Sequence, residues 1–145
     1  MTTTAPALNA RVIALAHHAA RTLAEGALDR HGITFHQSVT LRAVTVAGGS
    51  VPHGELTAEI QNSLKTTAPL VEAVIDELLT AGLLAREDSL LRLTDTGRDL
   101  YETTAAATAE IAARLYAGIP AEDLAVAGRV LTLITDRANA EPGAG

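Results

Sequence analysis

The sequence predicts a mainly α-helical protein that carries one small β-hairpin. Two observations on residues 54–93 predict this fold. First, apolar residues recur at helical spacing in two consecutive segments: Leu56, Ile60 and Leu64 at i, i+4 and i+8, and then Val71, Val74, Ile75 and Leu78 at i, i+3, i+4 and i+7. Second, two short apolar runs, 83–86 and 90–93, flank the polar Glu87-Asp88-Ser89, which suits a tight turn.

The ends of the second helix are also marked in the sequence. The break between the two helices falls at Lys65-Thr66-Thr67, where either threonine can cap the second helix, and Pro69 follows in its first turn. Gly82 comes after the last apolar position, where a residue with left-handed backbone commonly ends a helix. Two helices joined by a turn and followed by a hairpin predict a winged helix-turn-helix.

Two helices are expected before this segment. The first covers residues 8–28, whose apolar positions recur near helical spacing. A second is predicted over 33–47, although its many β-branched residues are equally typical of a strand. Gly48-Gly49 ends it, and Ser50 with Pro52 predicts the start of the next helix.

Two more helices are expected after the hairpin. One runs from Asp95 to about Ala117, and residues 118–120 then turn the chain. Glu122 and Asp123 follow in the first turn of a last helix, where the helix dipole favours acids. The terminal helices carry more apolar and small surface than the helix-turn-helix could cover, so we expect a second subunit.

Three segments resemble the MarR family of bacterial winged helix-turn-helix transcription regulators. VEAVIDELLTAGLLAR, from Val71 to Arg86, resembles their recognition helix and first wing strand. LTDTGRDL, from Leu93 to Leu100, matches an LT-x-x-G-R pattern at the second wing strand, and IPAEDLAVAGRVLTLITDRA resembles their last helix. The similarity covers residues 8–138.

The resemblance implies one MarR-type domain over 1–145, with a DNA-binding lobe at about 33–98 and a dimerisation lobe formed by about 7–32 plus 99–138. In this family the first, fifth and sixth helices interleave with those of a second subunit. A two-fold homodimer places two recognition helices about one DNA turn apart, so the expected target is a pseudo-palindromic site on double-stranded DNA.

The charge of the chain argues against this expectation. The formal net charge is −6, whereas DNA binding is driven largely by neutralising phosphates. Within residues 60–98, four basic side chains stand against six acidic ones. The alternative is therefore a winged-helix dimer that binds a protein or a ligand without binding DNA.

The candidate DNA-binding residues lie in two places. Lys65, Thr66, Thr67 and Leu70 lie at the start of the recognition helix, the end that enters a major groove, while Arg86 and Arg92 flank the wing. Helix capping explains Thr67 equally well, and the arginines also suit solvated strand ends. The short acidic wing departs from the family, in which many hairpins are longer and insert an arginine into the minor groove.

A ligand site is predicted on the first two helices. The family binds small anionic or phenolic ligands between its two lobes, and this resemblance points to His17, His18, Arg21 and His36. His17 and Arg21 share one helix face at i, i+4. These histidines can instead lie on the surface or in a dimer interface. No HxH or HxxxH spacing supports a metal site, and no cofactor is expected.

Composition excludes several other classes. The chain has no cysteine, which excludes disulfides, thiolate metal sites and thiol redox sensing. It has no nucleophile elbow or glycine-rich phosphate loop, so no enzyme is expected. No apolar run approaches a membrane span and the first residues lack a signal-peptide pattern, so the expected location is the cytoplasm. We expect a homodimeric transcription regulator, acting as a repressor and modulated by a small ligand.

Overall fold

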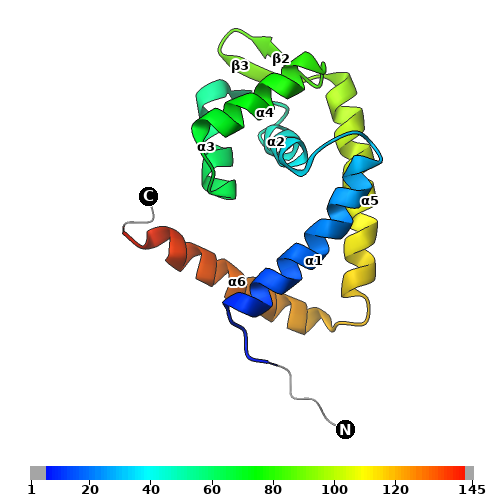
Figure 1. Ribbon diagram of the computed structural model, residues 1–145, viewed down its shortest axis with the longest axis vertical. Coiled ribbons are helices and arrows are strands. Elements are labelled where there is room, and N and C mark those ends of the chain that lie inside the picture. Colours follow the sequence, from blue (N-terminus) through cyan, green and yellow to red (C-terminus); the bar gives the residue numbers. More distant parts are fainter. Residues whose placement is uncertain (1–5, 143–145) are drawn as a thin grey trace. The chain divides into compact units, whose positions relative to one another are not determined.

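The structure is a computed structural model that describes residues 6–142, and it is mostly helical with one three-stranded sheet (Figure 1). The elements in chain order are α1 (Ala10–Asp29), α2 (Phe35–Val46), β1 (Ser50–Pro52), α3 (His53–Leu64), α4 (Ala68–Thr80), β2 (Leu84–Glu87), β3 (Leu90–Leu93), α5 (Asp95–Tyr116) and α6 (Ala121–Ala140). The prediction of a mainly α-helical fold with a small β-wing is confirmed.

The chain divides into two compact units, one ending at Ile111 and the other beginning at Ala112, so the boundary falls within α5. The first unit contains the winged helix-turn-helix together with α1 and most of α5. The second contains the end of α5 and α6. The predicted division into lobes at about 33–98 and at 7–32 plus 99–138 stays a prediction.

The hydrophobic core of the first unit forms where α2, α3 and α4 meet the sheet. The apolar positions predicted from helical spacing supply much of it, since Leu56, Ile60, Val71, Ile75 and Leu78 are each no more than 2% exposed. Because the two amphipathic faces are buried against one another, the helix-turn-helix has a defined geometry.

Segment 33–47 is helical despite its β-branched residues. Thr34 and Gln37 form a reciprocal capping box, in which Thr34 Oγ1 accepts from the Gln37 N–H at 3.1 Å and Gln37 Oε1 accepts from the Thr34 N–H at 3.0 Å. The hydroxyls of Thr40 and Thr45 donate to the main-chain oxygens of His36 and Leu41 within the helix. The capping box favours helix over strand in α2, and the two threonine hydroxyls find their acceptors within that helix.

The prediction that Ser50 and Pro52 open a helix is wrong. Residues Ser50–Pro52 form β1, which pairs antiparallel with β3 and gives the sheet order β1-β3-β2. Gly48 and Gly49 both adopt positive φ, at 99° and 96°, and turn the chain so that Gly49 O accepts from the Leu93 N–H at 2.8 Å. Val51 is buried on the sheet, and α3 begins directly afterwards at His53.

The predicted end of α4 is confirmed. Gly82 has φ 75°, its N–H donates to Leu79 O, and the Leu83 N–H donates to Leu78 O at 3.0 Å. This is the bonding pattern of a Schellman cap. At the other end Thr67 occupies the N-cap position and Pro69 lies in the first turn, but the Thr67 hydroxyl makes no capping hydrogen bond.

The LT-x-x-G-R segment joins β3 to α5. The Thr94 hydroxyl donates to the main-chain oxygen of Gly82 at 2.7 Å and accepts from the Gly97 N–H at 2.9 Å. A Cβ placed on Gly97 would collide with the carbonyl oxygen of Leu83. Thr94 therefore starts α5, and glycine at position 97 lets that helix approach the end of α4 closely.

Both terminal helices leave apolar side chains exposed. Helix α1 buries only Ala27 and Leu28, while its Leu15 and Leu23 are about half exposed. Helix α6, within its own unit, has no buried residue. No helix in the described part of the chain is long and apolar enough to cross a membrane.

Candidate nucleic-acid interface

The start of α4 presents a cluster of exposed side chains. Lys65 closes α3 in the left-handed conformation, with φ 53° and ψ 49°, and its Nζ donates to Asn62 Oδ1 at 3.1 Å. Thr66 is half-buried, Thr67 is exposed and Leu70 is 44% exposed. The turn between α3 and α4 therefore brings the four residues predicted at this end into one neighbourhood.

A second group of contacts joins α3, α4 and the wing. His53 Nε2 lies 2.7 Å from Glu72 Oε2, and His53 Nδ1 lies 3.1 Å from Arg86 NH1. The Thr57 hydroxyl donates to Glu72 Oε1 at 2.7 Å. We refer to His53, Thr57, Glu72 and Arg86 as the His53 cluster.

The His53 cluster fixes the ionisation of Glu72. The hydrogen bond from Thr57 lowers the pKa of the Glu72 carboxyl below its ordinary 4.5, and burial opposes this lowering. The hydrogen bond with His53, the positive charge of His53 when its ring is protonated, and the charge of Arg86 add to the lowering. Glu72 is therefore an anion near neutral pH, and both of its oxygens already accept hydrogen bonds within the protein.

The predicted wing arginines lie at different places on the sheet. Arg86 on β2 belongs to the His53 cluster, whereas Arg92 on β3 donates through Nε to Glu87 Oε2 at 2.9 Å. Strand β2 extends to Glu87, so the hairpin turn contains only Asp88 and Ser89, with Asp88 at φ 56°. Each wing arginine is exposed but has an internal partner.

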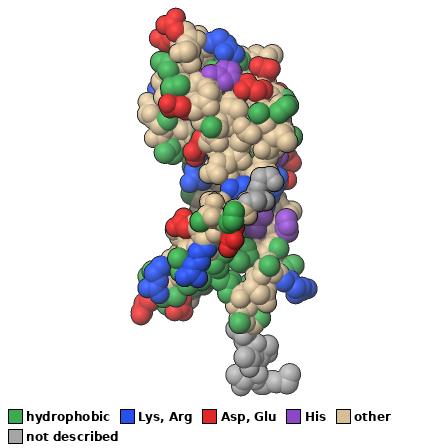
Figure 2. Space-filling model, turned by 90° about the vertical axis from the view of Figure 1, so that its left-hand side faces the viewer, with side chains coloured by type: hydrophobic (Ala, Val, Ile, Leu, Met, Phe, Trp, Pro, Cys, Tyr) green, Lys and Arg blue, Asp and Glu red, His purple; other side chains and the backbone are tan. Residues whose placement is uncertain are grey.

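The surface over this region is mixed in charge. On the face that Figure 2 shows, the upper part of the molecule carries scattered acidic side chains and few basic ones among uncharged residues, and the described residues form no broad basic patch there. This agrees with the formal net charge of −6. Binding of phosphates would therefore depend on individual cations rather than on a general positive field.

The residues predicted to bind a ligand separate into two groups. The Arg21 guanidinium lies 4.1 Å from the centroid of the Phe35 ring and pairs with Glu25, and Phe35 meets His36 edge-on with ring centroids 6.0 Å apart. His17 and His18 are exposed on α1, with ring centroids 5.4 Å apart. Arg21 and His36 are thus linked through Phe35.

Sequence reasoning missed Phe35, His53 and the role of Thr57. Phe35 is the single phenylalanine of the chain and directly precedes His36, which is a signal that could have found it. His53 and Arg86 are 33 residues apart and come from different elements. No spacing rule connects them.

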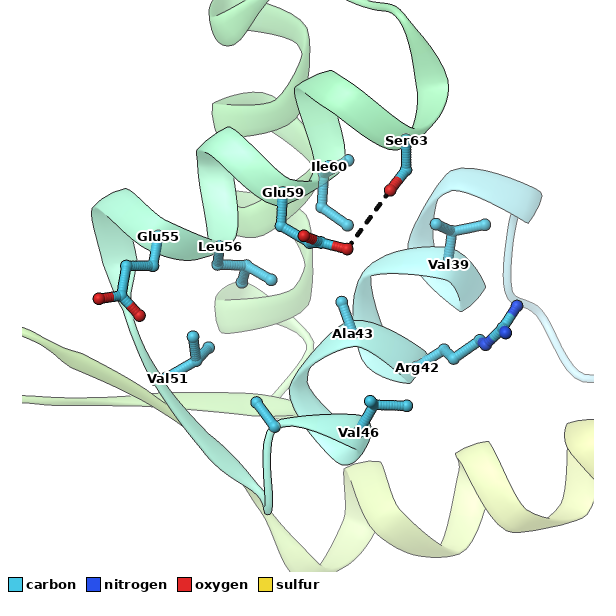
Figure 3. Close-up of a pocket in the computed structure, with 11 residues that line it drawn as sticks. Val39, Arg42, Ala43, Val46, Val51, Glu55, Leu56, Glu59, Ile60 and Ser63 are labelled. Carbon is cyan, nitrogen blue, oxygen red and sulfur yellow. Dashed lines mark hydrogen bonds between the residues drawn. The ribbon is translucent and has the colours of Figure 1, made fainter. Parts of the chain in front are cut away.

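An open groove of about 480 Å³ lies between α2 and α3 (Figure 3). Its walls are mainly apolar, and Glu59, whose carboxylate accepts from the Ser63 hydroxyl at 3.5 Å, lies over them. The full lining is Val39, Arg42, Ala43, Val46, Ala47, Val51, Glu55, Leu56, Glu59, Ile60 and Ser63. The volume suits a small ligand, but none of the four predicted ligand residues lines the groove.

No protein-family model matches the sequence, and no curated protein matches it. Solved structures do match. Reduced MarR from E. coli is 19% identical with a TM-score of 0.70, covering 90% of this chain and 95% of that one. The Mycobacterium tuberculosis MarR family protein Rv2887, in complex with DNA, is 23% identical with a TM-score of 0.71, covering 89% and 98%.

CouR from Rhodococcus jostii, bound to p-coumaroyl-CoA, is 18% identical with a TM-score of 0.74, covering 86% of this chain and 88% of that one. These likenesses extend over most of each chain. The chain therefore has the fold of solved MarR-type regulators, and the resemblance drawn from its sequence is confirmed at the level of the fold.

Proposed function

We propose that this chain, which has the fold of MarR-type regulators, is a DNA-binding transcription regulator of the MarR family. The observation that carries the proposal is the exposed start of α4, where Lys65, Thr66, Thr67 and Leu70 lie together. A helix-turn-helix reads the major groove with this end of its second helix. The likeness to Rv2887, whose solved structure is a complex with DNA, supports it.

Each residue of this cluster has a distinct role in the proposal. Lys65 supplies a cation for a phosphate, the Thr67 hydroxyl is available for a base or phosphate, and Leu70 contacts a thymine methyl group. Arg86 and Arg92 contact the phosphate backbone from the wing. Because both arginines have internal partners, binding requires each to exchange an internal contact for a phosphate.

The proposed regulator is a homodimer that acts as a repressor at pseudo-palindromic sites. The exposed apolar residues of the terminal helices support a dimer, because an isolated chain would leave them in water. On α6 these residues are Leu124, Val126, Leu131, Leu133 and Ile134, each between 36% and 47% exposed. Replacing Leu131 and Ile134 with aspartate would yield monomers in light scattering, whereas unchanged dimers would place the interface elsewhere.

A small anionic or phenolic ligand is proposed to modulate binding. Arg21 supplies positive charge, both Arg21 and His36 supply hydrogen-bond donors, and Phe35 supplies an aromatic surface between them. His17 and His18 extend the same proposed site along α1. CouR, which binds p-coumaroyl-CoA, shares the fold, and this supports a ligand-responsive regulator.

The test is fluorescence anisotropy on the duplex upstream of the gene for this protein, with a scrambled duplex as control. We expect selective binding that weakens linearly on a log–log plot against salt. Equal and weak binding to both duplexes would instead favour a winged-helix dimer that binds a protein or a ligand. Two observations favour that second function: the net charge of −6 and the internal partners of Arg86 and Arg92.

A further inference from the structure

The His53 ring has one acidic and one basic partner, and these partners define which nitrogen carries the proton. A guanidinium group can only donate hydrogen bonds, so Nδ1 must accept from Arg86 across their 3.1 Å separation. Nε2 then carries the hydrogen and donates to Glu72 Oε2 at 2.7 Å. The geometry corresponds to a neutral imidazole in the Nε2–H form.

These two contacts hold side chains from three elements. His53 is the first residue of α3, Glu72 lies on α4 and Arg86 lies on β2. The His53 ring is about one quarter exposed, and its main-chain N–H donates to Ser89 O at the hairpin turn. The charged groups that contact the ring are Glu72 and Arg86, one on each side.

We infer that His53 is a positioning residue for the proposed DNA interface: when neutral it holds Arg86 against the start of α3, and when protonated it releases Arg86 to bind a phosphate. The inference rests on the proposed function, because the released cation has a role only if DNA is the partner. His53 would thus change the affinity for DNA through Arg86, without contacting DNA itself.

The release of Arg86 follows from the hydrogen-bond donors and the charges of the protonated His53 ring and the guanidinium. A proton on Nδ1 leaves two donors facing each other and places an imidazolium beside the Arg86 guanidinium, so that contact breaks. Glu72 stays bound to Nε2–H, because the bond becomes one between opposite charges. Thr57 continues to hold the other carboxylate oxygen. Only Arg86 therefore leaves the His53 cluster.

The matched variants come from the chemistry of the side chains. In His53→Gln, an amide can donate to Glu72 and accept from Arg86 but cannot titrate, so it retains the neutral arrangement at every pH. Arg86→Gln removes the released cation. His31→Gln changes an exposed histidine in the turn after α1, outside the His53 cluster, and serves as the control.

The first measurement needs no DNA. Imidazole ¹⁵N chemical shifts of the full chain at pH 8 should show the Nε2–H form of His53, and a hydrogen on Nδ1 there would overturn the proposal. Because it uses the unaltered protein, this measurement stands even where a variant fails to fold.

The second measurement is DNA anisotropy at pH 8 and at pH 5.5, on either side of the ordinary histidine range near 6.5. One added phosphate contact should raise affinity about fivefold at low pH and steepen the log–log salt slope by about 1 in the unaltered protein and in His31→Gln. The gain should be absent in His53→Gln and in Arg86→Gln.

The outcomes separate this inference from the proposed function. Selective DNA binding with the same pH response in His53→Gln and the unaltered chain overturns the role of His53 and leaves the regulator intact. Absence of DNA binding at either pH overturns the role of His53 at a DNA interface together with the proposed function, even if the Nε2–H form is observed. A gain in DNA affinity at low pH in the unaltered chain and in His31→Gln, and no such gain in His53→Gln and Arg86→Gln, supports both proposals.

Discussion

Thr57 Oγ1 lies 2.7 Å from Glu72 Oε1, so a hydroxyl–carboxylate hydrogen bond joins α3 to α4 near the middle of the helix-turn-helix. Thr57 is 9% exposed, and its Oγ1 also lies 3.2 Å from His53 O. The bond between Thr57 and Glu72 links α3 to α4, the helix whose start forms the proposed DNA interface. It is also the largest cause of the lowered pKa of the Glu72 carboxyl.

Thr57→Val should destabilise the protein, because valine keeps the shape but cannot donate to Glu72. We expect the free energy of unfolding to fall by about 1.5–3 kcal/mol, as is typical of hydrogen bonds to charged groups. Urea unfolding measures the change. Thr103→Val, at an exposed position where the hydroxyl donates only to Asp99 O, is the matched control and should change stability by less than about 0.5 kcal/mol.

Acid should remove the stabilising effect of Glu72. Its pKa is lower in the folded protein than its ordinary 4.5, so its contribution to stability is complete above that pH and is lost as pH falls through the lowered pKa. Glu72→Gln should therefore be less stable than the unaltered chain at pH 6, and the difference should shrink at pH 3. A constant difference between these two pH values would contradict the assigned shift.

Two glycine substitutions should have opposite effects. Gly97→Ala places a methyl group against the carbonyl of Leu83 and should cost about 1–3 kcal/mol, in the range of overpacked sites. Gly26→Ala lies within α1 with no atom near the new methyl group, and should stabilise the helix by about 0.5–1 kcal/mol. Thermal unfolding of both variants tests the close approach of α5 to Leu83. A change in stability of the same sign in the two variants would refute that close approach.

The ion pair on the wing should limit DNA binding. Glu87 holds Arg92 at 2.9 Å, so Glu87→Gln should free the guanidinium and tighten binding, while Arg92→Ala should weaken binding to every sequence alike and flatten the salt slope by about 1. Anisotropy at several salt concentrations measures both. Unchanged affinity in Arg92→Ala would remove this part of the wing from the interface.

Ligand response should depend on Arg21 and not on the groove between α2 and α3. Arg21→Met keeps a flexible apolar contact with Phe35 but removes the charge, so it should abolish any release of DNA by a small anionic or phenolic ligand while leaving DNA affinity within about twofold. Val46→Asp, at a 78% exposed groove position, is the comparison. Loss of the response in Val46→Asp alone would move the ligand site to the groove.

Local patterns predicted most of the helices and the hairpin. Each of these patterns acts over a few residues, so it can be recognised in a single sequence. They are the periodic residues of α3 and α4, the Gly82 cap and the apolar runs around Glu87-Asp88-Ser89. Strand β1 was missed because it has only three residues and ends in proline, which is uncommon within sheets, and because it pairs with residues about 40 positions later.

The candidate site was less predictable than the fold because many of its contacts join residues that are far apart in the sequence. The residues at the start of α4 follow from their place in the motif. The His53 cluster depends on three separate contacts across α3, α4 and β2, and histidine and glutamate at those positions are unremarkable when each is considered alone. The partners of Arg86 and Arg92 decide how available these cations are, and only the folded arrangement identifies the partners.

The direct succession of β1 and α3 has a mechanical consequence. Pro52 pairs with Leu90 on the strand at the centre of the sheet, and His53 begins the helix with no residue between them. The pairing of β1 with β3 and the hydrogen bond from the His53 N–H to Ser89 O therefore tie the hairpin to the first turn of α3. We therefore expect a displacement of the wing to displace the start of that helix as well.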